Sequence, residues 1–480
     1  MLFNSTEFFW FMAVVLPAYY LLPARTRGLW RVLFMVAASY LFYMYWDPRY
    51  IILIITSTLI DYGCGRLFLR WPKHRHRWIP IISATTNLTI LGVFKYTDFF
   101  ASTLNVLLLR PAFGYELPMV IKGYLPVGIS FYTFQTMSYT LDIHRGEAKV
   151  EKSFWRFALY VSYFPQLVAG PIEKARNLLR RIEAAVPRPR PISPHLAVHQ
   201  IAYGLFKKIA VADNIGPLVE PIFENTGAYG AGQILLASVL FSMQIYCDFS
   251  GYTDIAIGVS RLFGIELMRN FRFPYFSTSL TSFWRRWHIS LSSWLKEYLY
   301  IPLGGNRRGE LQMHAAILVT MLLGGLWHGP SWNFVLWGAC HGVLLVGHKL
   351  WIKHSPLAGR AGPVAAAARA AVCLPLTFLV VTLIWIPFVC PDFQDTADAF
   401  RQLATWAPGQ VGPLNATLVS ICVLLSAVVA GYDIVLFWAE QSPLAARLTR
   451  PLRFAAPAAC VVLTFIFAAP EAQQFVYFAF

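Results

Sequence analysis

Two histidines stand among tryptophans and basic residues in a chain that is otherwise apolar. His288 ends the run WRRWH (284–288) inside the segment FWRRWHISLSSWLKEYLYIPLGGNRRG (283–309), and His328 lies between Trp327 and Gly329 in GGLWHGPSWNFVLWG (324–338). A neutral imidazole is a natural general base for a hydroxyl near neutral pH. The alternative for His328 is a hydrogen bond to a neighbouring carbonyl that fixes a helix end. Two such histidines, each beside a Trp, favour catalysis.

The basic residues around His288 allow two interpretations. Arg285, Arg286, Lys296 and Arg307 could bind lipid headgroups, with their stems in the bilayer. They could also form a cytoplasmic mouth for an anionic, phosphate-bearing donor, since the loop GGNRRG (304–309) offers backbone N–H groups that suit phosphate.

Asp248 and Asp254 lie in YCDFSGYTD (246–254). They could orient a histidine or a polar substrate, but pairing with an arginine of the basic segment, or capping a helix, is the favoured interpretation. The sequence holds no HExxH, GxSxG or Walker motif, and its seven cysteines are scattered. Hydrolase, kinase and metalloenzyme functions therefore have no motif support, and no metal site is predicted.

Composition predicts an all-α polytopic membrane protein. Hydrophobic residues make up 57% of the 480 and charged residues 13%, and many apolar runs approach the ~20 residues that cross a bilayer. These runs are continuous rather than alternating, which favours helices over a barrel. The net charge of +16 comes from Lys and Arg between the runs, which indicates positive-inside anchoring and no nucleic acid partner. The N-terminus is expected outside.

About 11–12 crossings are predicted, together with re-entrant or interfacial helices. Their expected ranges are 7–22, 30–46, 49–66, 78–95, 119–141, 313–327, 331–350, 371–390, 414–438 and 454–470, with two apolar segments at 231–247 and 252–265.

The remaining segments are predicted as follows. Residues 96–117 form an external gap, 157–176 a broken re-entrant segment, and 181–193 a loop. Residues 195–213 form either an amphipathic helix or a short span, and 391–406 an external helix. A single helix over 281–303, capped by Ser282, would put Trp284, His288, Leu291 and Leu295 on one face.

The chain resembles the membrane-bound O-acyltransferases, and within them the alginate O-acetyltransferase membrane-subunit group. The resemblance covers most of the chain. It is densest at 125–146, 163–175, 244–258, 282–307 and 324–342. It implies one domain over 1–480, with N-terminal helices (1–141), a catalytic core (142–350) and C-terminal helices (351–480). It also implies a ring of helices around a thinned centre, with a cytoplasmic cavity and a periplasmic funnel.

The resemblance also implies roles for individual residues. His328 matches the family's catalytic histidine, and His288 matches its second functional histidine. Trp284 and Trp287 would shape the pocket. The other candidate substrate-binding residues are Arg285, Arg286, Lys296, Asn306, Arg307, Trp327, Asn333 and Asp248. Asn306 and Asn333 lie in matching motifs but have no defined role.

The implied reaction is transfer of an acetyl group from a cytoplasmic thioester, acetyl-CoA, across a bacterial inner membrane. No cofactor is held permanently. The acceptor is a hydroxyl on an exopolysaccharide or on a periplasmic relay protein, with a polysaccharide synthesis and export complex as partner. IPFVCPDF (386–393) replaces the group's usual aromatic pair followed by Arg-Ala, which leaves the periplasmic partner and the polymer open.

Two other functions remain. One is a polysaccharide-precursor transporter or flippase, which would use the same polar groups as a path. Inverted repeats and paired broken helices are typical of transporters, and the sequence offers neither. The other is a non-catalytic scaffold of an export complex, against which the retention of both histidines speaks.

Overall fold

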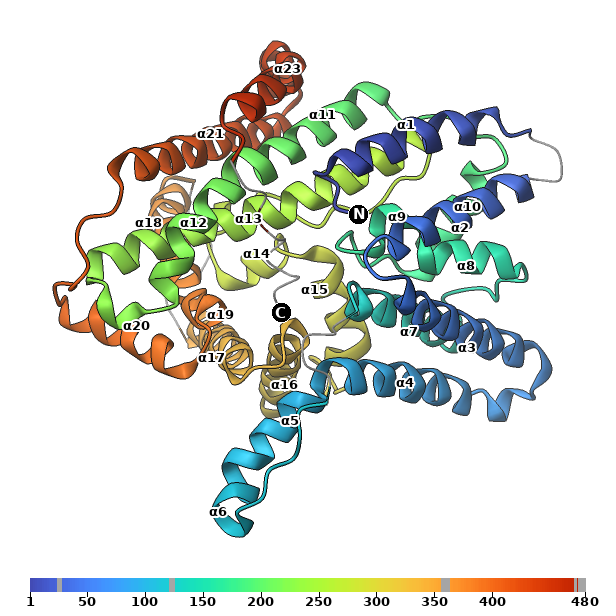
Figure 1. Ribbon diagram of the computed structural model, residues 1–480, viewed down its shortest axis with the longest axis horizontal. Helices are drawn as coiled ribbons and strands as arrows, with labels where there is room; N and C mark the ends of the chain where they lie inside the picture. The colour runs from blue at the N-terminus through green and yellow to red at the C-terminus, as the bar shows by residue number, and fades with distance from the viewer. Residues whose placement is uncertain (24–27, 121–125, 355–362, 470–472, 474–480) are drawn as a thin grey trace. The chain divides into compact units, whose positions relative to one another are not determined.

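The computed structural model describes residues 1–23, 28–120, 126–354, 363–469 and 473. Within these ranges every regular element is a helix, which confirms the predicted all-α class (Figure 1). The chain divides into two compact units, residues 1–201 with 255–268 and residues 202–254 with 269–480. The division of the chain into three parts of one domain stays a prediction.

The first unit contains the N-terminal helices. Their bounds are α1 Thr6–Leu21, α2 Leu29–Met44, α3 Ile51–Arg70, α4 Trp78–Leu91, α5 Thr97–Leu104, α6 Arg110–Phe113, α7 Ile129–His144, α8 Phe154–Ser162, α9 Phe164–Leu167, α10 Ala175–Ala185 and most of α11 Pro194–Leu205.

The second unit contains the helices that follow α11. Their bounds are η6 Phe206–Ala212, α12 Asp213–Phe223, α13 Ala231–Leu262 up to residue 254, α14 Leu280–Trp284, α15 Ile289–Leu295, η9 Lys296–Tyr300, α16 Glu310–His328, α17 Trp332–His354, α18 Pro363–Ile384, α19 Ile386–Val389, α20 Phe393–Thr405, α21 Ala416–Gln441, α22 Pro443–Leu448 and α23 Arg450–Ile466.

Among the described residues, six helices are long and apolar enough to cross a membrane. They cover 48–70, 231–262, 310–328, 332–354, 367–389 and 416–441. The apolar helices α1 and α2 are shorter. The predicted crossings 7–22 and 30–46 correspond to these shorter helices, the crossings 78–95, 119–141 and 454–470 also form helices of fewer than 18 residues, and the pair 231–247 and 252–265 forms a single helix. The chain is a multi-pass membrane protein.

Helices α3, α4 and α7 lie side by side in the first unit (Figure 1) and share a buried polar cluster. Asn87 donates to Asp61 Oδ2 at 2.8 Å and accepts from Ser57 at 2.7 Å, while Ser83 donates to the other oxygen of Asp61. A carboxyl group inside an apolar helix is costly unless it is hydrogen-bonded. This cluster supplies the hydrogen bonds, and Thr140 of α7 joins it by donating to the Ser83 hydroxyl at 2.9 Å, so that the three helices are tied to one another.

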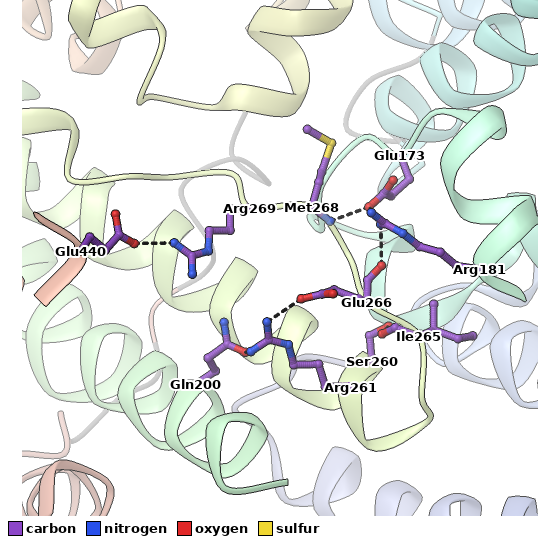
Figure 2. A network of polar contacts seen from close by, with 10 residues as sticks. All are labelled: Glu173, Arg181, Gln200, Ser260, Arg261, Ile265, Glu266, Met268, Arg269 and Glu440. Atoms are coloured by element: carbon purple, nitrogen blue, oxygen red, sulfur yellow. Dashed lines mark hydrogen bonds and ion pairs between the residues drawn. The ribbon is translucent and has the colours of Figure 1, made fainter. Parts of the chain in front are cut away.

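The first unit is completed by the C-terminal end of α13 and the segment after it (Figure 2). Arg181 lies 3.1 Å from the buried carboxylate of Glu173 and donates to the Glu266 carbonyl at 2.6 Å. The backbone N–H of Met268 donates to Glu173 Oε1 at 2.5 Å. Arg261, near the end of α13, pairs with the Glu266 carboxylate at 2.7 Å. Residues 255–268 are thus an integral part of the N-terminal unit.

Several predicted segments are confirmed by the structure. The segment 157–176 is broken, because α8 ends at Ser162 and the short α9 ends at Leu167, and these residues are buried. Residues 195–213 and 391–406 are helical as predicted, the first running from α11 through η6 and the second forming α20.

Other segments differ from prediction. Residues 181–185 continue α10 instead of belonging to a loop, and 97–113 are helical where a gap was expected. Helix α7 begins only at Ile129, after Gly128 in the left-handed region at φ +77°. Residues 121–125, within the predicted crossing 119–141, lie outside the described part of the chain.

The prediction of two separate apolar segments at 231–247 and 252–265 is wrong, because α13 runs unbroken from Ala231 to Leu262. Its two aspartates are neutralised within the second unit, Asp248 by Lys208 at 2.8 Å and Asp254 by Lys207 at 2.5 Å. A Cβ on Gly251 would lie 2.7 Å from the Gly204 carbonyl. Gly251 therefore serves a close helix contact and does not end the helix.

Helices α16 and α17 pack closely through glycines. A Cβ on Gly338 would lie 2.3 Å from the Met321 carbonyl, and one on Gly325 would lie 2.1 Å from the Phe334 carbonyl. Small residues at such contacts are typical of membrane helix pairs. The glycines therefore set the separation of the two helices that carry His328 and its neighbours.

A Gly338→Ala protein is expected to be less stable by about 1–3 kcal/mol, because the added methyl group meets backbone atoms that cannot move aside without separating the helices. Thermal unfolding in detergent measures the change. Gly347, where an added Cβ would meet no atom within 4 Å, provides the control variant Gly347→Ala. An unaltered Gly338→Ala midpoint would contradict the close contact.

Candidate active site

His288 lies at a sharp bend between α14 and α15, not inside one helix. Its backbone adopts the left-handed conformation, φ +42° and ψ +55°. The helix predicted over 281–303 is therefore wrong in two respects: it is interrupted at His288, and its N-cap is Ser279, whose hydroxyl accepts from the Ser282 N–H at 3.2 Å. The helical structure ends at Tyr300, the last residue of η9, three residues before the predicted end at 303. Trp284 and His288 do not share a helical face with Leu291.

The bend is held by a segment just after α13. The Asn270 carbonyl accepts from the Ile289 N–H at 2.8 Å, and its side chain accepts from the Ser290 N–H and hydroxyl at 3.1 and 2.7 Å. The Arg272 N–H donates to the Arg286 carbonyl at 2.9 Å. A non-glycine residue in this backbone region costs energy and persists where surrounding contacts fix it, often at functional sites. These hydrogen bonds supply the fixing contacts.

The His288 ring is fully buried among aromatic rings. Its centroid lies 4.7 Å from that of Phe249, 6.0 Å from Trp327 and 6.4 Å from His328. Burial lowers the pKa of His288 to about 3. His288 is therefore a neutral imidazole at physiological pH, able to donate and accept hydrogen bonds.

His328 is the last residue of α16 and is buried. The rings of Trp327, Trp337 and Phe388 contact it edge to face, at centroid distances of 5.1, 5.0 and 5.5 Å. A Cβ on the following Gly329 would lie 2.2 Å from the Phe334 ring, so only glycine fits there. The structure brings the two predicted histidines together, each next to Trp327.

Three residues of this aromatic cluster were not predicted. Trp337 from α17 stacks on Trp385 at 5.7 Å, and Phe388 from α19 contacts both, at 5.3 and 5.2 Å. Trp287, which was predicted, contacts Trp385 at 5.1 Å. Trp337 is within the GGLWHGPSWNFVLWG segment that was singled out, and Phe388 is within IPFVCPDF, which was noted for the partner and not for the site. Trp385 comes from an ordinary apolar run and carries no sequence signal.

A third histidine, His341, links the helix before the bend to the cluster. Trp284 Nε1 donates to His341 Nδ1 at 3.3 Å, so a neutral His341 carries its proton on Nε2. The His341 ring lies 4.8 Å from that of Trp337, which in turn contacts His328. His341 and Trp337 are four residues apart on α17, a spacing that puts them on one face and could have identified both.

Asn333 is near the cluster but its known contact is structural. Its side-chain amide donates to the Cys390 carbonyl at 2.9 Å. This hydrogen bond ties the start of α17 to the end of α19, which carries Phe388. Asn333 therefore positions the helix whose Phe388 ring contacts His328.

The basic residues predicted to hold the donor do not form one group. Arg285 is exposed and lines a pocket, whereas Arg286 lies over the Phe437 ring at 5.6 Å. Lys296 and Arg307 are exposed, and neither lines that pocket.

Two polar candidates have contacts of their own. The exposed Asn306 accepts from the Tyr300 hydroxyl at 2.6 Å. Asp248 pairs with Lys208, not with an arginine near His288. The prediction that Asp248 is paired is right, although its partner differs.

Lowering the pH from 7.5 to 5.0 is expected to destabilise the protein partly through His288. The unfolded chain binds a proton on this histidine near pH 6.5, while the folded chain does so only near pH 3. The free energy of unfolding therefore includes the full contribution of neutral His288 above about pH 6.5. This contribution is lost as the pH falls towards 3, and the loss at pH 5.0 is about 1–2 kcal/mol. Thermal unfolding at both pH values measures this loss. A His288→Gln protein should lose less on acidification, and an equal loss would contradict the burial of a neutral ring.

Comparison with known proteins gives the family. A model of the membrane-bound O-acyltransferase family matches residues 40–361. The protein named "Probable alginate O-acetylase AlgI" of Azotobacter vinelandii is 35% identical over 455 residues, which are 92% of this chain and 86% of the relative. The protein named "Peptidoglycan O-acetyltransferase" of Helicobacter pylori is 35% identical over 381 residues, 73% of this chain and 71% of the relative.

A more distant relative is the "Teichoic acid D-alanyltransferase" of Bacillus subtilis, 27% identical over 239 residues, which are 47% of this chain and 60% of the relative. The names of the three relatives give alginate, peptidoglycan and teichoic acid as the polymers, and acetyl or alanyl as the group transferred. The family model and these relatives show that the chain belongs to the membrane-bound O-acyltransferase family and is an O-acyltransferase.

Proposed function

We propose that the protein transfers an acetyl group from acetyl-CoA in the cytoplasm to a hydroxyl of an exported polysaccharide, directly or through a periplasmic acetyl-accepting protein. The observation that carries the proposal is the pair of buried histidines, His328 and His288, with ring centroids 6.4 Å apart. We propose acetyl rather than alanyl as the transferred group, because the relatives that match most of the chain are named O-acetylase and O-acetyltransferase.

In the proposed reaction His328 is the general base. It takes the proton of the acceptor hydroxyl while that oxygen attacks the thioester carbonyl carbon. The C–O bond forms, the C–S bond breaks, and the proton passes to the departing thiolate. His288 is buried beside it as a neutral imidazole. It can donate a hydrogen bond to the carbonyl oxygen as negative charge develops there.

The aromatic wall excludes water from this step. Trp327, Trp337, Trp385 and Phe388 are buried around His328, and exclusion of water protects the thioester from hydrolysis. Trp287 and Trp284 extend the wall towards the bend at His288. We place the protein in a bacterial inner membrane with its N-terminus in the periplasm, because the basic residues lie in gaps expected to face the cytoplasm.

The direct test is acetyl transfer in proteoliposomes. Protein reconstituted with acetyl-CoA labelled in the acetyl group is supplied with a candidate polysaccharide, and label released from the polymer by mild alkali reports ester formation. Ester-linked label is the expected result. Movement of the polysaccharide across the bilayer without any bound label would overturn the proposal in favour of a transporter, and absence of both would favour a scaffold.

A further inference from the structure

The buried polar cluster of α3, α4 and α7 in the first unit surrounds one acidic side chain (Figure 1). Asp61 is fully buried in α3, within the segment 48–70 that is long and apolar enough to cross a membrane. The other side chains of the cluster are neutral, carry oxygen and are each at most 1% exposed: Ser57, Ser83, Asn87, Thr136 and Thr140. Hydroxyl and amide oxygens from three helices therefore enclose a single carboxyl group.

The hydrogen bonds of the cluster have the pattern of an ionised Asp61. Thr140 donates to the Ser83 hydroxyl at 2.9 Å, and Ser83 directs its own proton to one oxygen of Asp61. The side-chain amide of Asn87 donates to the other oxygen at 2.8 Å. An ionised carboxylate only accepts hydrogen bonds, whereas a protonated one uses one oxygen as a donor. Both oxygens of Asp61 accept, which indicates the charged form.

The Asp61 carboxylate lacks a counter-charge. It forms no ion pair with any residue in the described part of the chain. The buried carboxylates of Asp248 and Glu173, in contrast, lie 2.8 Å from Lys208 and 3.1 Å from Arg181. A charge in an apolar interior is costly unless it is paired as well as hydrogen-bonded. The cluster is therefore one positive charge short.

A hydroxyl at the edge of the cluster also lacks a partner. Thr133 lies on α7 three residues before Thr136 and seven before Thr140, a spacing that puts the three side chains on one face of the helix. Its hydroxyl oxygen is buried and forms no hydrogen bond with a described residue. Buried polar atoms are normally hydrogen-bonded. This face of α7 therefore offers an oxygen that the protein itself does not use.

We propose that Na⁺ binds in this cluster, coordinated by Asp61 together with hydroxyl and amide oxygens of α3, α4 and α7. One carboxylate balances the charge of one monovalent ion, whereas the higher charge of Ca²⁺ is usually met by more than one carboxylate. Ligand sets made only of oxygen are typical of hard cations. The bound ion holds the three helices together and is independent of the proposed acetyl transfer. Hydroxyl and amide ligands have no characteristic spacing in a sequence, which is why no metal site was predicted.

Thermal unfolding of the purified protein in detergent tests the site without a measurement of activity. Na⁺ is titrated against N-methyl-D-glucamine at constant ionic strength. The thermal midpoint should rise by about 2 °C for each tenfold increase in Na⁺ above the dissociation constant, because the ion binds the folded protein and not the unfolded chain. A midpoint that does not depend on Na⁺ would overturn the proposal, and this measurement needs no variant to fold.

Variants of the cluster locate the ion. Without Na⁺, an Asp61→Asn protein should be more stable than the wild type, because the substitution removes an uncompensated charge and keeps the shape of the side chain. Na⁺ should no longer raise its midpoint, and binding of radiolabelled Na⁺ should be lost. Thr140→Val should weaken that binding about tenfold. The control is Thr86→Val, which removes a hydroxyl that donates to the Ile82 carbonyl of its own helix and should leave Na⁺ binding unchanged.

A neutral, protonated Asp61 is the alternative that these measurements separate. In that case the wild type and Asp61→Asn would have similar midpoints without Na⁺, and neither would bind radiolabelled Na⁺. That pair of results would overturn the cation site and leave a hydrogen-bonded carboxyl group in its place. Binding of Na⁺ that is equal in the wild type and in Asp61→Asn would likewise exclude this cluster as the site.

Discussion

A His328→Ala protein is expected to lose about 10²–10⁴-fold in kcat for acetyl transfer, the range that removal of a general base produces. The loss should fall on kcat, because His328 is proposed to move a proton in the reacting step and contacts Trp337 inside the buried aromatic cluster. Initial rates with purified protein in nanodiscs, at saturating donor, measure it.

The control for this variant is His74→Ala, which removes an exposed histidine of the first unit. It should transfer acetyl at the wild-type rate. Coenzyme A binding by His328→Ala protein shows that the variant is folded. A folded His328→Ala protein with wild-type kcat would remove His328 from the reaction and with it the proposed mechanism.

A Lys208→Met protein is expected to be severely destabilised. The Lys208 ammonium is buried and lies 2.8 Å from both Asp213 and Asp248, whose side chains are also buried. Removing one member of a buried ionic group leaves uncompensated charge and typically costs about 3–5 kcal/mol. The expected result is a large fall in the thermal midpoint in detergent, or no folded protein at all.

A charge-balanced variant keeps this prediction testable if Lys208→Met does not fold. Combining it with Asp213→Asn and Asp248→Asn removes the stranded charges and should recover most of the lost stability. Lys149→Met, which alters an exposed lysine, should have no measurable effect. A triple variant no more stable than Lys208→Met would show that the three charges do not act as one group.

The sequence predicts the elements that depend on local signals. Helices α16, α17 and α21 follow from apolar runs of spanning length, and the end of α16 at His328 follows from the Gly-Pro that comes after it. The sequence singles out His288 and His328 as imidazoles in an apolar chain, and the resemblance to a family assigns them the different roles proposed above.

What the sequence could not predict depends on distant partners. α13 passes unbroken through Asp248 because Lys208, forty residues earlier, neutralises the charge. The bend at His288 depends on hydrogen bonds from Asn270, and without these a helix through 281–303 is the better local choice. Phe388 contacts the rings of His328 and Trp385 from a segment that the sequence relates only to the periplasmic partner, and Trp385 precedes it in an apolar run without a signal of its own.

The order of residues in the first unit has a consequence for biosynthesis. Its buried Glu173 and the Arg181 beside it take hydrogen-bonding partners from residues 266–268, which leave the ribosome only after residues 202–254 of the other unit. Domains generally fold in the order of synthesis, but this N-terminal unit stays incomplete until part of its neighbour is already in the membrane. In a nascent chain halted at residue 201, the Glu173 carboxylate lacks the Met268 N–H that donates to it in the complete protein. The two units are therefore expected to mature together during translation, with membrane insertion of α13 as the step that both await.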